Sequence, residues 1–177
     1  LPVGGKHPPV VVVQLREGQL RCADDPPHID RRQRTGTLEA RTAFADGFPL
    51  LVISTASLAE LNRRLAASGH DAVTMQRFRP NIVLDGVADA HGEDFIDTLT
   101  LESADGPVVI KLVKPCGRCT IPDVNPATAE QGHAVADTMS AYRANARIGG
   151  ALAFGQNAVI VAGVGHRLRV GGRRFTH

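Results

Sequence analysis

The sequence predicts a mainly β protein with two or more helices, in which many short strands form a barrel or a sandwich and the helices pack on its outside. Three observations support this fold class. Apolar runs of strand length recur along the 177 residues. Turns separate these runs, and they draw on 18 glycines and 11 prolines. Only two stretches show the spacing of an amphipathic helix.

The first part of the chain has the least regular pattern. Val10–Leu15 is a β-branched run that predicts a buried strand, and Gln19–Ala23 is a candidate to pair with it. Residues 24–37 are rich in Asp, Pro, Arg and Gly, which is typical of a long polar loop and of disorder. We therefore expect a poorly defined segment over residues 1–39, either lead-in strands or the remnant of a preceding domain. A single β-barrel domain is expected over residues 40–177.

A turn and a short strand open the second region. Phe44–Pro49 contains Asp46 and Gly47, two residue types that tolerate positive φ, and this pattern indicates a tight turn. Leu50–Ser54 follows as an apolar run of strand length.

The first helix is predicted directly after this strand. Ser57 and Glu60 match a capping box, in which the serine begins the helix and the glutamate bonds back to it. Apolar residues at helical spacing continue over residues 57–67, and Gly69 provides a stop.

The remaining elements follow as strands and one further helix. Three strands are expected at Ile82–Leu84, Phe95–Leu101 and Val108–Val113. Further along the chain, we expect a helix over Ala136–Ile148 and two more strands at Ala158–Ala162 and Leu168–Val170.

Composition limits the class of function. The net charge is +2, and the seven aromatic residues include no tryptophan, so a stacking platform for nucleic acid is not expected. No apolar run has the roughly 18 residues that a membrane span requires, so no membrane partner is expected either. Three cysteines are an odd number, which favours a reducing compartment over a disulfide framework. We therefore expect a cytoplasmic protein.

Two of the cysteines form the most informative motif, a C-x-x-C made of Cys116 and Cys119 with Arg118 between them. A structural zinc site needs four ligands, and Cys22 is the only further cysteine. A dithiol redox motif should open a helix, which Pro122 opposes. A single functional thiolate beside a cation is a third interpretation, in which Arg118, next to Cys119, favours the thiolate. Two small buried residues at the end of a strand are the fourth, and the spacing alone does not decide among these four.

A second polar cluster surrounds a proline. Arg77, Arg79 and Asn81 lie around Pro80 just before a predicted strand. The cluster is either ordinary surface charge or a set of donors for an anion, because the guanidinium fork suits oxyanions and phosphates.

Several segments, read in order, resemble the MOSC domain, the module named for the C-terminal part of molybdenum-cofactor sulfurase. The resemblance covers roughly residues 40 to 172 and is nearest to the branch of the amidoxime-reducing components and their bacterial relatives. The segments are FADGFPLLVIS, SLAELNRRL, RFRPNIVLDG, KPCGRCTIPDVNPATAE, FGQN and a closing G-x-x-L-R-V-G.

The resemblance implies a MOSC-type β-barrel that binds a pterin-based molybdenum cofactor. In that family the second cysteine of the C-x-R-C segment ligates molybdenum, which corresponds to Cys119 and makes it the implied catalytic residue. Gly117 lies just before the Arg-Cys pair, where relatives often have serine. The other positions that the resemblance places at or near the cofactor are Arg79, Asn81, Asp46, Gly47, Gly117 and Arg118.

The implied function is an oxidoreductase that reduces N-hydroxylated small molecules. The Lys-Ser pair and additional arginine that precede this region in relatives have no equivalent before residue 40. Too few cysteines are present for a four-thiolate iron–sulfur cluster, so electrons would come from a separate electron-transfer protein. Two alternatives remain open: a sulfur-carrier module with a persulfide on Cys119, and a non-catalytic fragment.

Overall fold

The structure is a computed structural model that describes residues 31–35, 38–42, 47–169 and 174–176. The predicted strands at residues 10–15 and 19–23 lie outside the described residues. In chain order the helices and strands are β1 (Arg31–Thr35), β2 (Leu38–Thr42), β3 (Leu50–Ser54), α1 (Thr55–Ala67), β4 (Ile82–Leu84), β5 (Thr98–Leu101), β6 (Val108–Gly117), α2 (Ala134–Ser140), β7 (Ala153–Ala162) and β8 (Arg174–Thr176). Four 3-10 turns lie between them: η1 (Met75–Arg77), η2 (Gly92–Phe95), η3 (Ile121–Asp123) and η4 (Ala146–Ile148).

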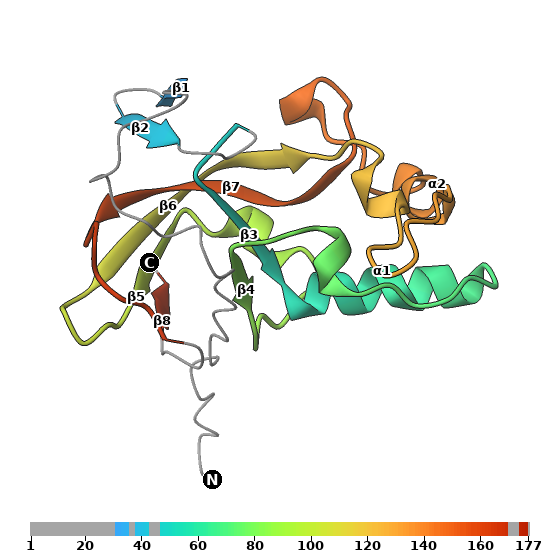
Figure 1. Ribbon diagram of the computed structural model, residues 1–177, viewed down its shortest axis with the longest axis horizontal. Helices are drawn as coiled ribbons and strands as arrows, with labels where there is room; N and C mark the ends of the chain where they lie inside the picture. The colour runs from blue at the N-terminus through green and yellow to red at the C-terminus, as the bar shows by residue number, and fades with distance from the viewer. Residues whose placement is uncertain (1–30, 36–37, 43–46, 170–173, 177) are drawn as a thin grey trace, which may run out of the picture.

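A six-stranded sheet in the order β4-β3-β7-β6-β5-β8 forms the centre of the described structure. β3 and β4 run parallel, and the other pairings within this sheet are antiparallel. The long strands β6 and β7 bend together, so that the sheet curls into part of a barrel, and both helices lie beyond one end of it (Figure 1). The predicted fold class, mainly β with helices outside the sheet, is confirmed.

A separate two-stranded sheet precedes the main one. β1 pairs with β2 in antiparallel register, with Arg32 opposite Arg41. Part of the stretch predicted as a polar loop, residues 24–37, is therefore a strand. The loop was predicted from the polar composition of this stretch alone, without Leu38–Thr42 as a partner strand.

The core consists of two clusters that share β3. Side chains of a strand alternate between faces, so Val52 enters one cluster and Ile53 the other. The first cluster lies within the curl of the sheet, and the second joins the sheet to the two helices. Beside Val52, the first contains Leu50, Ile82, Leu84, Leu99, Leu101, Val108, Ile110, Leu112 and Ala158, and beside Ile53 the second contains Leu61, Leu65, Val73, Phe78, Val135, Met139 and Phe154.

The N-cap of helix α1 lies three residues earlier than the capping box indicates. Ser54 is the N-cap, and its hydroxyl accepts from the backbone N–H of Ser57 at 3.1 Å. Glu60 instead binds the guanidinium groups of Arg63 and Arg64 on the helix surface. The predicted end is confirmed, since the helix stops just before Gly69, which has φ of 77°.

Strand β6 is longer than predicted because its pairing with β7 continues to Gly117, opposite Ala153. The ladder is irregular on both sides of Pro115, as expected for a residue that has no N–H to donate. β6 therefore carries Cys116 within the sheet.

Further predicted boundaries are also wrong, among them the start of β7, which is Ala153 and not Ala158. Phe95 ends the 3-10 turn η2 and is 91% exposed, so the next strand begins only at Thr98. Helix α2 covers Ala134–Ser140 instead of reaching Ile148. Leu168 lies outside any described strand.

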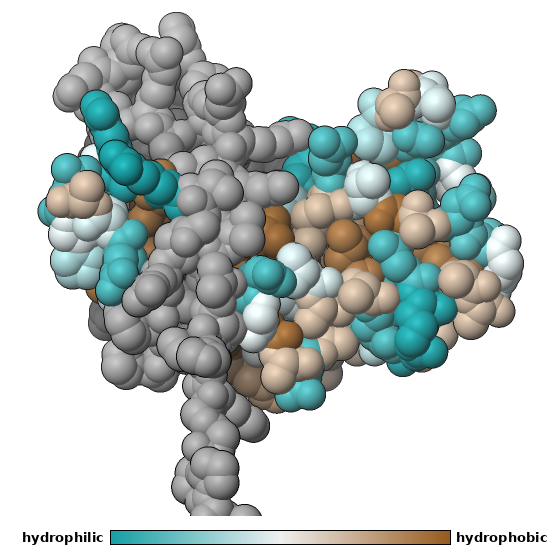
Figure 2. Space-filling view, turned by 90° about the horizontal axis from the view of Figure 1, so that it is seen from below, coloured by the Kyte–Doolittle hydropathy of each residue, from teal (hydrophilic) through white to brown (hydrophobic). Residues whose placement is uncertain are grey.

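Apolar residues on the described part of the surface occur as patches interrupted by hydrophilic side chains (Figure 2). Within the described residues, no helix combines the length and the hydropathy that crossing a membrane requires.

Candidate functional site

The two motifs singled out in the sequence meet in space. The guanidinium of Arg118 donates to the carbonyl oxygen of Phe78 at 3.0 Å. A second bridge runs in the opposite direction, because Arg77 Nη1 donates to the carbonyl oxygen of Pro122 at 3.2 Å. These two contacts join the RFRPN segment to the C-x-x-C segment across some forty residues of sequence.

The FGQN segment and the start of β3 complete this region. Leu51 and Asn81 form two hydrogen bonds, from Leu51 N to Asn81 Oδ1 at 2.8 Å and from Asn81 N to Leu51 O at 2.9 Å. Leu51 lies opposite Asn157 of β7, which in turn lies opposite Lys114 of β6. Asn157 Nδ2 also donates to Pro115 O at 3.4 Å. Four of the segments that carry the resemblance therefore meet in one continuous row across three strands.

The turn before β3 lies beside the same row. Lys114 Nζ is 5.0 Å from the centre of the Phe48 ring, which brings the residues next to Gly47 to the end of β6. Gly47 itself has open space where a Cβ would be. Asp46 lies outside the described residues.

The two cysteines of the C-x-x-C motif have different surroundings. Both are free thiols; Cys116 is partly buried on β6, and Cys119 is exposed. Arg118 Nη1 lies 3.3 Å from the sulfur of Cys116. The backbone is still extended here, since Arg118 N donates to Leu152 O at 2.8 Å, so residues two apart share a face. The guanidinium of Arg118, which the sequence interpretation placed beside Cys119, thus contacts Cys116 instead.

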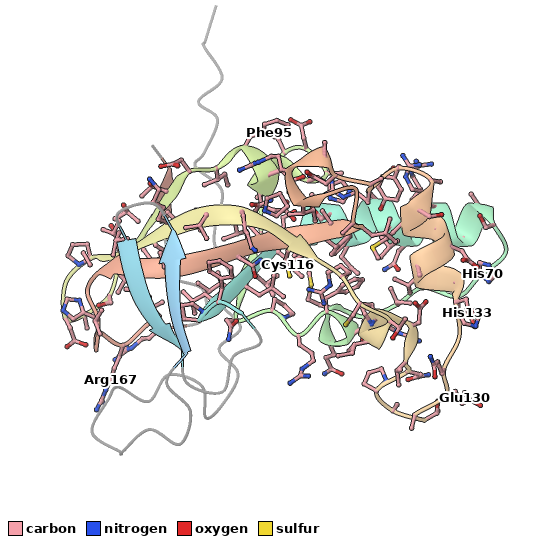
Figure 3. The ribbon with its side chains drawn as sticks, turned by 90° about the horizontal axis from the view of Figure 1, so that it is seen from above. His70, Phe95, Cys116, Glu130, His133 and Arg167 are labelled. Carbon is pink, nitrogen blue, oxygen red and sulfur yellow. The ribbon has the colours of Figure 1, made fainter. Side chains whose placement is uncertain are left out.

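The described side chains around the motif do not form a metal-binding cluster of their own. Among the described residues, no group of three or more His, Cys, Asp or Glu side chains is arranged to hold a metal ion. The imidazole of His133 lies at the end of the molecule that carries α2, away from Cys116 (Figure 3).

Arg79 has an unusual backbone conformation. Its φ is 55°, in the left-handed region, although it is neither glycine nor asparagine and it precedes a proline. Such a conformation costs on the order of 1–3 kcal/mol and persists only where the surroundings hold it. The next residue, Pro80, is buried, whereas Arg79 is exposed. The structure therefore stabilises a strained peptide that presents a guanidinium to solvent.

A tightly packed layer supports this region. The buried rings of Phe78 and Phe154 stack with their centroids 4.3 Å apart. Gly155 has φ of 80°, and a Cβ there would lie 2.5 Å from Ile53 Cγ1 and 2.7 Å from Val52 O. The FGQN segment thus requires its glycine both for conformation and for close approach to β3. At Gly117 an added Cβ would make only ordinary contacts, 3.5 Å from Ile148 Cδ1, so this position has room for a Cβ.

Sequence reasoning missed a buried polar network beneath the site. Glu93 is fully buried, and its carboxylate accepts from Ser54 N at 3.2 Å, from Ser54 Oγ at 2.7 Å and from Ser57 Oγ at 2.7 Å. The backbone N–H of His91 donates to Ser57 Oγ at 2.9 Å. The only signal in the sequence is a Glu within HGEDF, between a turn and a strand, and no local rule predicts its burial.

A second part of this network holds β7. Asp94 accepts from Arg143 Nη2 at 2.8 Å and from Gln156 Nε2 at 2.7 Å. His91 packs against Tyr142 and Phe154, and burial, with a smaller contribution from Arg143, lowers the pKa of His91. Burial raises the pKa of the Tyr142 hydroxyl. Gln156, part of the FGQN motif, is therefore buried as a structural anchor.

Comparison with known proteins agrees with this arrangement of motifs. The family model described as the MOSC domain matches residues 39–172. The chain belongs to the MOSC domain family. The match contains every described element from β3 to β7, and with them the two bridged motifs.

Curated relatives of this MOSC domain include amidoxime-reducing components. Human mitochondrial amidoxime-reducing component 1 is 38% identical over 102 residues, which cover 57% of this chain and 28% of the relative. Human mitochondrial amidoxime reducing component 2 is 38% identical over 104 residues, or 58% of this chain and 28% of the relative. The molybdenum cofactor sulfurase of Arabidopsis thaliana is 30% identical over 126 residues, 67% of this chain and 14% of the relative. The chain thus spans less than a third of the length of these relatives.

Proposed function

We propose that this MOSC domain binds a pterin-based molybdenum cofactor, with the thiolate of Cys119 as its ligand to the metal. The observation that carries the proposal is the bridged pair of motifs, which fixes the exposed Cys119 segment against the strained Arg79 segment. The donor set fits such a group. Cys119 offers an accessible soft ligand, and Arg79 offers a guanidinium for an anionic phosphate.

The proposed activity is the reduction of N-hydroxylated small molecules, as the names of the amidoxime-reducing relatives suggest. The cofactor would supply the redox chemistry, and this chain would hold and orient it. Reduction of an N–OH group to N–H consumes two electrons and two protons and releases water. Because this chain carries few cysteines, we propose that a separate electron-transfer protein delivers the electrons.

The test compares two cysteine variants expressed in a host that makes the cofactor. We expect Cys119→Ser to lose most of its molybdenum and oxidised-pterin fluorescence, because serine is a poor substitute for a thiolate at a soft metal. Cys116→Ser is the matched control, and it should retain both because its hydroxyl still accepts from Arg118. Equal molybdenum content in Cys119→Ser and the wild type would refute the assignment of the ligand.

A second function is favoured by the exposure of Cys119 and by the similarity to a molybdenum cofactor sulfurase. In this case the Cys119 thiolate would take the outer sulfur of a persulfide donor, which leaves as a thiolate, and would pass that sulfur to a nucleophilic acceptor, which returns Cys119 to its thiolate. Intact-protein mass spectrometry would detect one additional sulfur atom that a thiol reductant removes and that Cys119→Ser lacks. A chain with neither metal nor persulfide would correspond to the non-catalytic fragment.

The compartment is also a proposal. The cysteine content favours a reducing compartment, and we propose the cytoplasm, whereas the amidoxime-reducing relatives are named mitochondrial. Fractionation of cells that express the full-length protein would decide between these two locations.

A further inference from the structure

The peptide group between Phe78 and Arg79 has both of its polar atoms bonded. Its N–H, on Arg79, donates to Gln76 O at 3.3 Å. Its carbonyl, on Phe78, accepts from Arg118 Nη2 at 3.0 Å. Turning this peptide group changes φ of Arg79, so the two hydrogen bonds together hold that angle at 55°.

Arg118 is itself fixed by other contacts. Its backbone N–H donates to Leu152 O, which anchors it beside β7. Its second terminal nitrogen lies 3.3 Å from the sulfur of Cys116, and its Cζ lies 5.4 Å from the centre of the Phe78 ring. The guanidinium is therefore held between Cys116 and Phe78, with both terminal nitrogens directed at groups of this chain.

We infer that Arg118 is a positioning residue, which acts on the site through Arg79. By binding the carbonyl of Phe78, it keeps Arg79 in the left-handed conformation and so presents the Arg79 guanidinium. The family resemblance places Arg118 among residues that touch the cofactor, whereas these contacts direct it at the supporting backbone. An arginine suits this role because its planar fork serves two acceptors at once, which a lysine ammonium on a flexible stem does not do in a fixed geometry.

The first experiment measures conformation in the cofactor-free, full-length chain. Backbone chemical shifts from NMR report whether φ of a residue is positive. We expect Arg118→Lys to move Arg79 out of the left-handed region and to leave the signals of α1 unchanged. Arg64→Lys is the matched control, because Arg64 pairs with Glu60 within α1; it should leave Arg79 as in the wild type.

Two results would overturn the inference at this stage. One is unchanged shifts of Arg79 in Arg118→Lys. The other is loss of the whole fold in both Arg118→Lys and Arg118→Gln, because a residue that positions only residues 78–81 is not needed for α1 to form.

The second experiment rests on the proposed function and measures molybdenum per chain when the cofactor is too scarce to saturate the protein. Arg118→Lys should lower it about tenfold, the factor expected for one lost hydrogen bond from a charged donor. Arg79→Asn removes the guanidinium with a residue that tolerates positive φ. If Arg118 acts through Arg79, the double variant should hold no less molybdenum than Arg79→Asn alone.

The outcomes separate the inference from the function on which it rests. A further loss in the double variant, equal to that of Arg118→Lys alone, would show that Arg118 acts independently and would overturn the inference. Absence of molybdenum from the wild type would refute the proposed function, and the NMR result would still decide whether Arg118 holds Arg79.

Discussion

Replacing Glu93 by glutamine should destabilise the protein more than any comparable change on its surface. The carboxylate of Glu93 is fully buried and accepts three hydrogen bonds, from Ser54 N, Ser54 Oγ and Ser57 Oγ. Glutamine has nearly the same size, but one of its two terminal groups is an NH₂ that only donates. The two serine hydroxyls then have to reorient, and their charge-assisted hydrogen bonds to the carboxylate are replaced by neutral ones.

The magnitude follows from the loss of charge assistance in the two hydroxyl bonds. A hydrogen bond to a charged group contributes about 1 kcal/mol more than a neutral one, so we expect the free energy of unfolding to fall by about 2 kcal/mol. With a urea m-value of about 2 kcal/mol/M, the unfolding midpoint should fall by about 1 M. The assay is urea unfolding at pH 7 followed by circular dichroism.

The control is Glu60→Gln, the same chemical change on the surface of α1. Glu60 pairs with Arg63 and Arg64 near solvent, and exposed pairs contribute less than about 1 kcal/mol. A midpoint for Glu93→Gln that falls no further than that of Glu60→Gln would show that the Ser54–Ser57–Glu93 network does not stabilise the fold.

Two further predictions concern backbone conformation and pH. Gly155→Ala should lower the free energy of unfolding by about 3 kcal/mol, because its Cβ would collide with Ile53 and Val52 as well as adopt positive φ. Gly149→Ala shares the positive φ but meets open space, so thermal unfolding should show a loss of only about 1 kcal/mol; equal losses in the two variants would contradict the packing argument. The hydrogen bond from Arg63, with help from Arg64, lowers the pKa of Glu60 to about 2 in the folded protein. The stability that Glu60 contributes is therefore complete above its unfolded pKa of about 4.3, and it is lost as the pH falls through about 2. The difference in the free energy of unfolding between wild type and Glu60→Gln should therefore shrink between pH 5 and pH 2. A difference that stays constant over this range would contradict the assignment of the pKa shift to the Arg63 and Arg64 contacts.

Local sequence patterns correctly predicted the helices and strands that are determined by residues close together in the sequence. The strands at Leu50–Ser54 and Ile82–Leu84 were placed correctly because continuous apolar runs between turns specify buried strands. The end of α1 before Gly69 was also predicted, since glycine accepts the left-handed conformation that ends many helices.

The errors arise where a residue far away in the sequence determines the boundary of an element. The start of α1 was misplaced because Ser54 is held as N-cap by Glu93, which lies 39 residues further along the chain. β6 extends through Pro115 because β7 pairs with it, and no sequence pattern within residues 108–117 predicts that pairing.

For the candidate site, the sequence indicated which residues matter and not how they are connected. RFRPN and C-x-x-C were each ambiguous in the sequence. The contacts of Arg118 with the Phe78 carbonyl and of Arg77 with the Pro122 carbonyl show that they form one unit. The partner of Arg118 was misjudged because adjacency in sequence suggested Cys119, whereas side chains two residues apart on an extended strand share a face. The roles of Cys119, Arg79, Asn81 and Gly47 toward a cofactor stay predictions.

The position of β7 in the sheet has a consequence for biosynthesis. β7 inserts between β3 and β6, so that Leu50 pairs with Ala158 across more than half of the chain. Contacts this distant form only after a large loop has closed, and a ribosome releases the chain from its N-terminus. Asn157 joins Leu51 to Lys114, and the row that carries the motifs is incomplete without it. A nascent chain that stops before residue 153 therefore contains all the thiols and arginines of the candidate site, but they are not yet assembled. Any cofactor would have to bind after β7 has emerged.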